Sequence, residues 1–182
     1  MAKYGKTAKA FLLAVTPAQQ SALYSNKNDC YFGDYPTLGE LNRAYTPQTA
    51  QAWLIPQLTD LSEYCGARDK FTKNQLKQCS EIIASDYYYL KVSELMLFFA
   101  RFKRCCYGRF YGTVDPLIIT EALKEFCRER NIAYCEQARK EREQNLKESR
   151  KNACTWEEYL RQKGEKQRPS PLARIEKQLN GQ

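Results

Sequence analysis

Apolar residues recur at steps of three and four positions through the middle of this 182-residue chain. That spacing places them on one face of an α-helix. Three consecutive segments carry such faces: Leu76, Cys79, Ile82, Ile83 and Tyr87; then Leu95, Phe98, Phe99, Phe102 and Cys106; then Ile119, Ala122, Leu123, Phe126 and Cys127. A fourth layer is supplied by Trp53, Leu54, Leu58 and Leu61. Since short connections separate these segments, the pattern predicts an all-α fold, a small helical bundle.

Helix starts are marked by residues that cap a helix amino terminus. A threonine, aspartate or serine precedes proline at positions 16, 46, 115 and 170, and proline is favoured at the first position of a helix. Ser93 and Glu94 open another helix with an acid in its first turn. We expect helices at residues 17–25, 38–45, 47–65, 73–88, 93–106, 116–149, 156–163 and 171–179. Pro56 should kink or split the third of these near Trp53, and Gly108 is a candidate helix stop.

The periodic pattern fades towards both ends of the chain. We expect residues 1–34 to form an N-terminal arm with one short helix, and residues 35–135 to form the helical core. Beyond residue 136 charged side chains dominate, with favourable pairs four residues apart such as Glu136 with Lys140. Residues 136–182 are therefore predicted to be a solvated, projecting helical extension followed by a mostly disordered, flexible tail.

The formal net charge of +8 is unevenly distributed along the chain. Residues 1–100 carry ten basic and nine acidic side chains, whereas residues 101–110 carry four basic and no acidic ones. Residues 128–182 carry 14 basic and nine acidic side chains. The positive excess is thus concentrated in one short stretch and in the C-terminal third, where a polyanion would be attracted.

The chain contains no histidine. Serine–histidine and cysteine–histidine catalysis, histidine-ligated zinc and facial-triad iron all need an imidazole. A nucleophilic tyrosine at Tyr87, Tyr88 or Tyr89 would lack an activating base or metal, so packing is the preferred interpretation of these rings. We expect a non-enzymatic protein with no cofactor and no metal site.

Eight cysteines are present, and none belongs to a Cys-x-x-Cys pair. This spacing favours buried free thiols over a four-thiolate zinc site or a set of disulfides. We expect Cys106 to be buried on its apolar face and the adjacent Cys105 to be half-buried. Unpaired thiols favour a reducing compartment, and the apolar run at residues 10–15 is too short for a membrane span or an ordinary signal peptide. A cytoplasmic protein without a membrane partner is expected.

The stretch from Arg101 to Pro116 carries four basic residues, four aromatic rings and two glycines, with no acid before Asp115. Basic side chains neutralise phosphates, and aromatic faces stack on bases. The candidate nucleic-acid-binding residues are Arg101, Lys103, Arg104, Tyr107, Arg109 and Tyr111. On a helical wheel Arg101 and Arg104 point away from the apolar face, free to meet a partner. The alternative is a structural role, with cations favoured at a helix C-terminus and rings that plug the loop into the core.

Two further features concern possible partners. Met96 and Leu97 lie off the main apolar face of their helix and are candidates for a partner surface, the alternative being a second buried face. The connection between residues 108 and 115 is longer than the turn of a helix-turn-helix motif. Contact with a nucleic-acid backbone or a single strand therefore fits the residues better than base reading in a groove.

Two runs of residues carry a family resemblance: Leu90 to Lys103, Leu-Lys-Val-Ser-Glu-Leu-Met-Leu-Phe-Phe-Ala-Arg-Phe-Lys, and Tyr107 to Pro116, Tyr-Gly-Arg-Phe-Tyr-Gly-Thr-Val-Asp-Pro. With them, residues 35–135 resemble a family of uncharacterised small helical proteins encoded by anaerobic gut bacteria and their phages or mobile elements. They also distantly resemble the helical replication-accessory proteins of phages, such as helicase loaders. The resemblance implies a DNA-replication context and assigns no activity to particular residues.

The residue patterns predict a non-enzymatic, nucleic-acid-associated accessory protein that contacts phosphates through the basic stretch, and the resemblance implies that it belongs to a phage or mobile element, with a role in replication. The alternative is a protein-interaction module that uses the C-terminal extension, with the basic stretch purely structural. Nucleic acid, a replication protein or another protein are the candidate partners.

Overall fold

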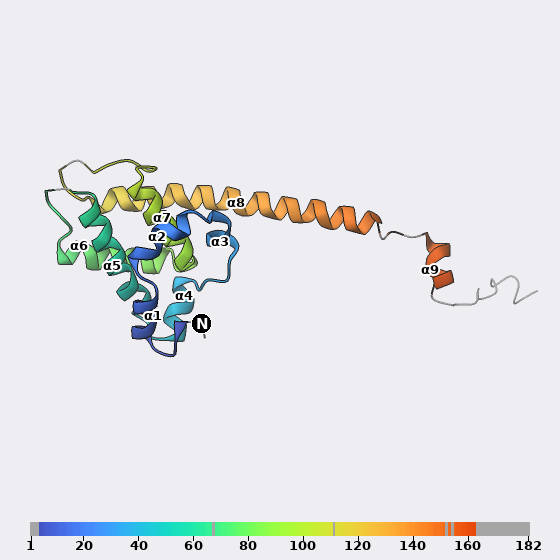
Figure 1. Cartoon of the computed structure of the whole chain (residues 1–182), viewed down its shortest axis with the longest axis horizontal. Helices are drawn as coiled ribbons and strands as arrows, with labels where there is room; N and C mark the ends of the chain where they lie inside the picture. The colour runs from blue at the N-terminus through green and yellow to red at the C-terminus, as the bar shows by residue number, and fades with distance from the viewer. Residues whose placement is uncertain (1–3, 67, 111, 152, 154, 163–182) are drawn as a thin grey trace, which may run out of the picture. The chain divides into compact units, whose positions relative to one another are not determined.

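The computed structural model describes residues 4–66, 68–110, 112–151, 153 and 155–162 of the chain. The fold is all-α, as predicted, and no β-strand occurs among these residues (Figure 1). Its elements, in chain order, are α1 (Ala8–Ala14), the 3₁₀ helix η2 (Pro17–Gln19), α2 (Gln20–Tyr24), α3 (Lys27–Phe32), α4 (Leu38–Ala44), α5 (Thr49–Tyr64), α6 (Lys73–Asp86), α7 (Val92–Lys103), α8 (Pro116–Lys151) and α9 (Trp156–Gln162).

The chain divides into two compact units, Met1–Tyr134 and Cys135–Gln182, and α8 begins in the first and ends in the second. Residues 139–151 of α8 are exposed throughout. Projection of this segment from the bundle stays a prediction, and the expected helix at residues 171–179 lies outside the described residues. In the part of the chain that the structure describes, no helix has both the length and the apolar character needed to cross a membrane.

The centre of the first unit is α7. Every residue from Val92 to Ala100 is buried, so this helix is enclosed on all sides by its neighbours rather than on one face. It packs against α2, α3 and α5. Met96 and Leu97 are 1% and 0% exposed, so the second buried face is the correct interpretation and their placement on an open partner surface is wrong. The predicted faces of α5 and α8 are confirmed, with Trp53 and Phe126 among the fully buried side chains.

The N-terminal segment contributes more to this core than the sequence indicated. We expected one short helix within residues 1–34, but α1 and α3 are present as well as α2. Both are too short to show a clear helical period, and they are held by tertiary contacts. Phe11 of α1 is fully buried, and the indole N–H of Trp53 donates a 2.9 Å hydrogen bond to the carbonyl oxygen of Val15.

Pro56 does not split the third predicted helix, since α5 runs unbroken from residue 49 to residue 64. Proline removes the hydrogen bond that its own N–H would donate to the carbonyl four residues earlier, at Ala52. Both residues lie on the exposed side of α5, where water can satisfy that carbonyl. The helix therefore continues because the lost hydrogen bond faces solvent.

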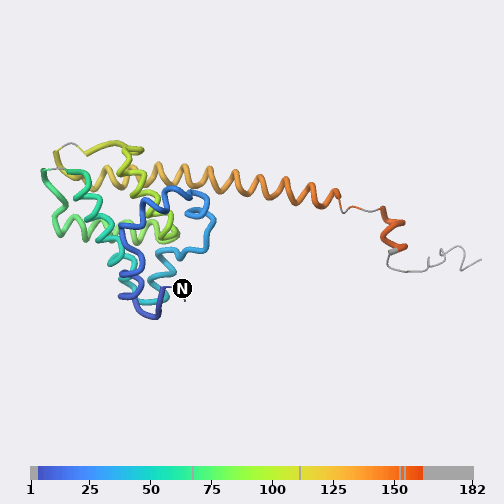
Figure 2. The backbone as a smooth tube through the Cα atoms, viewed as in Figure 1, coloured from blue at the N-terminus to red at the C-terminus, as the bar shows by residue number. Residues whose placement is uncertain are grey.

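Two loops that are distant in sequence lie side by side at one end of the first unit (Figure 2). Asp69, between α5 and α6, pairs with the segment that precedes α8. Its N–H donates to the carbonyl of Gly112 at 3.3 Å, and its own carbonyl accepts from the N–H of Val114 at 3.0 Å. These two hydrogen bonds fix the segment that precedes α8 against the loop between α5 and α6.

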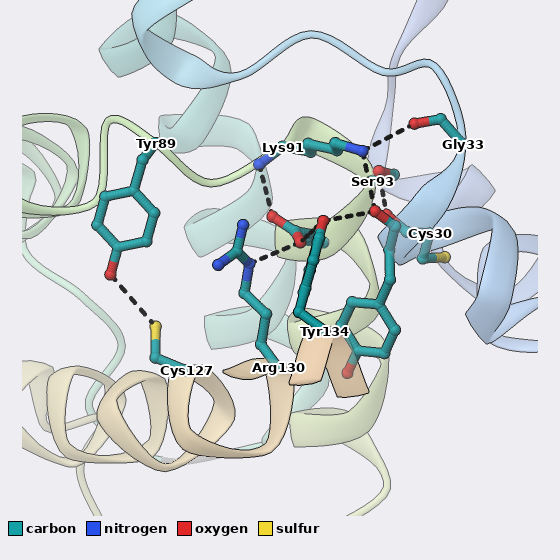
Figure 3. Close-up of polar contacts among 10 residues, drawn as sticks. Cys30, Gly33, Tyr89, Lys91, Ser93, Cys127, Arg130 and Tyr134 are labelled. Atoms are coloured by element: carbon teal, nitrogen blue, oxygen red, sulfur yellow. Dashed lines mark hydrogen bonds and ion pairs between the residues drawn. The ribbon is translucent and has the colours of Figure 1, made fainter. Parts of the chain in front are cut away.

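A buried carboxylate joins α7 to α8. Glu94 is 0% exposed, and its Oε1 accepts a 2.7 Å charge-assisted hydrogen bond from Nε of Arg130 on α8 (Figure 3). Its Oε2 accepts a 2.8 Å bond from the backbone N–H of Lys91, which caps the start of α7. The hydroxyl of Tyr134 lies 3.0 Å from Oε1, and burial raises the pKa of this phenol to about 12, so it stays protonated. An unpaired carboxylate here would be strongly unfavourable, so these donors are required.

The same cluster caps α3. A helix leaves its last carbonyl groups without intrahelical partners, and α3 is too short to be stable alone. Ser93 Oγ donates to the carbonyl of Cys30 at 2.8 Å, and Lys91 Nζ donates to the carbonyls of Tyr31 and Gly33, each at 2.9 Å (Figure 3). The hydroxyl of Tyr134 also lies 2.6 Å from the Tyr31 carbonyl, so its one proton serves either acceptor. Side chains from α7 and α8 thus hold α3 in place.

We predict that Glu94→Ala destabilises the protein by about 3 kcal/mol or more, because it leaves the largely buried Arg130 guanidinium without its counter-charge. Tyr134→Phe removes only a neutral donor, so its cost should be about 1 kcal/mol. The free energy of unfolding from urea titration measures both. Equal costs for the two variants would show that Arg130 is compensated in another way.

Candidate nucleic-acid interface

The basic stretch begins where α7 ends, and that end comes earlier than predicted. α7 stops at Lys103, and the next turn is closed by two hydrogen bonds, from the N–H of Cys106 to the carbonyl of Arg101 at 3.2 Å and from the N–H of Cys105 to the carbonyl of Phe102 at 2.8 Å. This is the Schellman pattern, which places one residue in the left-handed region. That residue is Cys105, with φ of 60°, rather than the expected Gly108.

The early stop explains the exposure of two cysteines. Cys106 was expected on the apolar face of the helix, but it lies beyond the helix end, and both Cys105 and Cys106 are exposed. The other described cysteines are free thiols, of which Cys30 and Cys79 are buried. Burial raises the pKa of each of these two thiols to about 11, which makes them poor nucleophiles. No cluster of three or more potential metal ligands occurs in the described ranges.

Arg101 is not free to meet a partner as the helical wheel indicated. Its guanidinium forms an ion pair with Glu129 of α8 and lies 5.2 Å from the ring centroid of Tyr107. Tyr107 stacks on Phe98 with 5.6 Å between ring centroids, and its hydroxyl donates a 3.2 Å hydrogen bond to Glu129. Burial raises the pKa of the Tyr107 hydroxyl, so it remains a donor at neutral pH. The two candidate residues therefore form part of the contact between α7 and α8.

Lys103 is also paired within the bundle. Its ammonium group forms an ion pair with Asp60 of α5 and lies 5.4 Å from the ring centroid of Tyr64. Phe110, further along, stacks on Phe102 with 5.2 Å between centroids. These contacts attach both sides of the turn to the core.

Arg104 differs from its neighbours because no acid pairs with it in the described part of the chain. It is exposed, and its guanidinium carbon lies 3.9 Å from the ring centroid of Tyr24 on α2. One of its N–H groups donates a 2.8 Å hydrogen bond to the carbonyl of Ala100. The ammonium group of Lys27 on α3 lies 5.4 Å from the same ring centroid. We name Arg104, Tyr24 and Lys27 the Tyr24 cluster.

Two candidate residues of the basic stretch remain, Arg109 and Tyr111. Arg109 is exposed, and no ion pair involves it within the residues that the structure describes. Tyr111 lies outside the described residues. Of the six predicted residues, the structure brings Arg101 and Tyr107 together, attaches Lys103 to α5, and leaves Arg104 on an exposed surface with two residues that sequence reasoning missed.

Tyr24 and Lys27 were missed because they lie about 80 positions before Arg104 in the sequence. No periodicity or motif connects the short α2 and α3 to the basic stretch. Only the packing of α2 and α3 against α7 brings these residues together.

The fold and this site define a small all-α protein in which two cations lie around one aromatic ring, neither of them in an ion pair within the described part of the chain. The chain belongs to the family of unknown function DUF6633, whose model matches residues 70–169. That segment includes α6 to α9, and with them Arg104, whereas Tyr24 and Lys27 precede it. No curated protein and no solved structure matches the chain.

The family match confirms the expected uncharacterised family. An origin in gut bacteria or phages and a likeness to replication-accessory proteins stay predictions.

We predict that Cys105→Gly raises the free energy of unfolding by about 1 kcal/mol, because glycine adopts a positive φ without steric cost. Cys106→Gly is the matched control. That residue has no positive φ, so the change should add only the entropic cost of glycine, about 0.5 to 1 kcal/mol of destabilisation. Urea unfolding of the two variants measures the difference, and equal effects would contradict the assignment of strain to Cys105.

Proposed function

We propose that this protein is a non-enzymatic, cytoplasmic, nucleic-acid-associated accessory protein of a phage or mobile element, with a role in replication. In this proposal Arg104 and Lys27 of the Tyr24 cluster, together with Arg109, contact phosphates. The observation that carries it is the grouping of Arg104 and Lys27 around Tyr24, with no ion pair to either cation among the residues that the structure describes.

Two like charges held close together favour an anion between or above them. The two cationic centres lie no more than about 9 Å apart, the sum of their distances to the Tyr24 ring centroid. Their mutual repulsion is weak in water, about 0.5 kcal/mol, and each cation gains about 0.5 to 1 kcal/mol from the ring. The arrangement is therefore stable without a ligand, and a phosphate near the cluster would be attracted by both cations.

The other cations of the basic stretch support this site rather than form it. Arg101 and Lys103 are neutralised by Glu129 and Asp60, so a phosphate would have to compete with an existing carboxylate. Their pairs fix the end of α7 against α8 and α5. We propose that they position Arg104.

Binding to a 20-base-pair DNA duplex, followed by fluorescence anisotropy between 50 and 200 mM salt, tests this site. The slope of log K against log salt is about −0.9 for each phosphate contact. Arg104→Gln and Lys27→Gln should each weaken binding and reduce the magnitude of the slope by about one.

Arg43→Gln is the matched control, because Arg43 is an exposed arginine on α4. It should leave the slope unchanged. If Arg104→Gln and Arg43→Gln gave the same slope as the unaltered protein, the Tyr24 cluster would not be the phosphate-binding site.

A second candidate function, a protein-interaction module, is favoured by an aromatic pair in the second unit. Trp156 of α9 is 70% exposed and stacks on Tyr159 with 5.4 Å between ring centroids. Large exposed aromatic side chains are typical anchors of protein–protein interfaces. In this candidate the basic stretch serves only to hold α7 against its neighbours.

The two candidates are separated by a variant that ends at Gln137. It keeps Tyr134, and so retains the hydrogen bonds of this residue with Glu94 and with the Tyr31 carbonyl. If a partner protein is captured by the full chain, the module predicts that capture is lost in this variant and in Trp156→Ala, but not in Arg104→Gln. DNA binding that follows Arg104 instead, with no protein captured, would exclude the module.

A further inference from the structure

We infer that the Tyr24 cluster recognises the phosphodiester backbone of nucleic acid alone, and that no base stacks on its aromatic ring. This inference rests on the proposed function and specifies the ligand of the same site. It differs from the expectation raised by the sequence, in which rings interleaved with cations indicate base stacking.

The described rings of the basic stretch already have partners. Tyr107 is stacked on Phe98 and also carries the Arg101 guanidinium, 5.2 Å from its centroid. Phe110 is stacked on Phe102, with an angle of 27° between the ring planes. Each is partly buried and packs against the core. A base that displaced these contacts would have to open the junction between the turn and the bundle.

Tyr24 has a cation where a base would stack. The guanidinium carbon of Arg104 lies 3.9 Å from the ring centroid, which is the contact distance of two stacked groups. A base can take that place only if it displaces the arginine. The ring therefore acts as a support for Arg104.

This support fixes the arginine for phosphate recognition. The hydrogen bond to the Ala100 carbonyl uses one of the five N–H donors of the guanidinium, and within the described residues no other acceptor bonds the rest. A guanidinium held by a ring and by a backbone carbonyl loses little side-chain freedom on binding. Its free N–H groups match the oxygen atoms of a phosphate in a bidentate arrangement.

Lys27 adds a second positive charge, and its ammonium group has no flat face on which a base could stack. Its ammonium group lies 5.4 Å from the Tyr24 centroid and is exposed. An ammonium is a point charge that contacts phosphate and cannot read a base by stacking. Both cations of the cluster therefore recognise the part of a nucleic acid that is independent of sequence.

The test compares two fluorescently labelled 20-mers at one salt concentration: an oligothymidine strand, and a strand of abasic spacers with the same number of phosphates. Backbone recognition predicts dissociation constants within threefold of each other. Stacking contributes about 1 to 3 kcal/mol per base, so a single stacked base would make the abasic strand roughly five- to 150-fold weaker. A loss of more than threefold would overturn the inference while it leaves the proposed function standing. If neither strand binds, the inference is overturned, and if the 20-base-pair duplex does not bind either, the proposed function is overturned with it.

A variant of the supporting ring gives an independent readout. Tyr24→Leu removes the ring beneath Arg104, so both strands should bind about three- to fivefold more weakly, by the same factor. Tyr24→Phe keeps the ring and should bind both strands as the unaltered protein does. Tyr88→Leu, at an exposed tyrosine before α7, is the matched control and should change neither affinity. If Tyr24→Leu lost affinity for the oligothymidine strand alone, Tyr24 would stack on a base. An unchanged midpoint of urea unfolding confirms that the variant is folded.

Discussion

A carboxylate that is buried away from water needs hydrogen-bond donors and a counter-charge. Glu94 is such a carboxylate, and the packing of the first unit depends on the donors around it. The residue lies in the first turn of α7, the most enclosed helix of the bundle, so its neighbours must supply the charge and the hydrogen bonds. Arg130 and Tyr134 of α8 do so, and Tyr134 lies next to a carbonyl at the end of α3 as well. One buried charge thus determines how α8 is rotated about its axis and where α3 ends.

Charge pairing also determines which cations at the C-terminal end of α7 are neutralised. Four basic residues within ten positions look alike in the sequence, but each meets a different environment once the helices pack. Arg101 faces α8 and finds Glu129, and Lys103 faces α5 and finds Asp60. Arg104 is the first residue past the helix and lies over the ring of Tyr24, where a cation is stabilised without being neutralised. Of the four basic residues of the stretch, only Arg104 and Arg109 have no ion pair among the described residues, so the charge left for a partner is about half of the local net charge.

The backbone reversal after α7 connects these two consequences. Cys105 adopts a left-handed conformation that closes the helix with two backbone hydrogen bonds. The chain then leaves α7 immediately after Arg104, which places Tyr107 back against Phe98 and Phe110 against Phe102. Aromatic residues that would be free to stack on bases in an extended loop are in this way used as packing. The turn thus leaves Arg104 exposed, while its described aromatic rings pack against the core.

The sequence by itself determined the helical class of the fold, the longer helices and most of the core, because those features depend on local periodicity and on capping residues. The faces that contain Phe98 and Phe126 follow from spacing alone, as does the start of α8 at Pro116. It did not reveal α1 and α3, whose few residues show no clear period, nor the end of α7, which depends on a strained cysteine rather than on a glycine. Only the tertiary structure decided which cations are paired, that Glu94 is buried against Arg130, and that Tyr24 and Lys27 meet Arg104. Those are contacts between segments far apart along the chain, and the energies that select them come from burial and charge pairing, which no local pattern records.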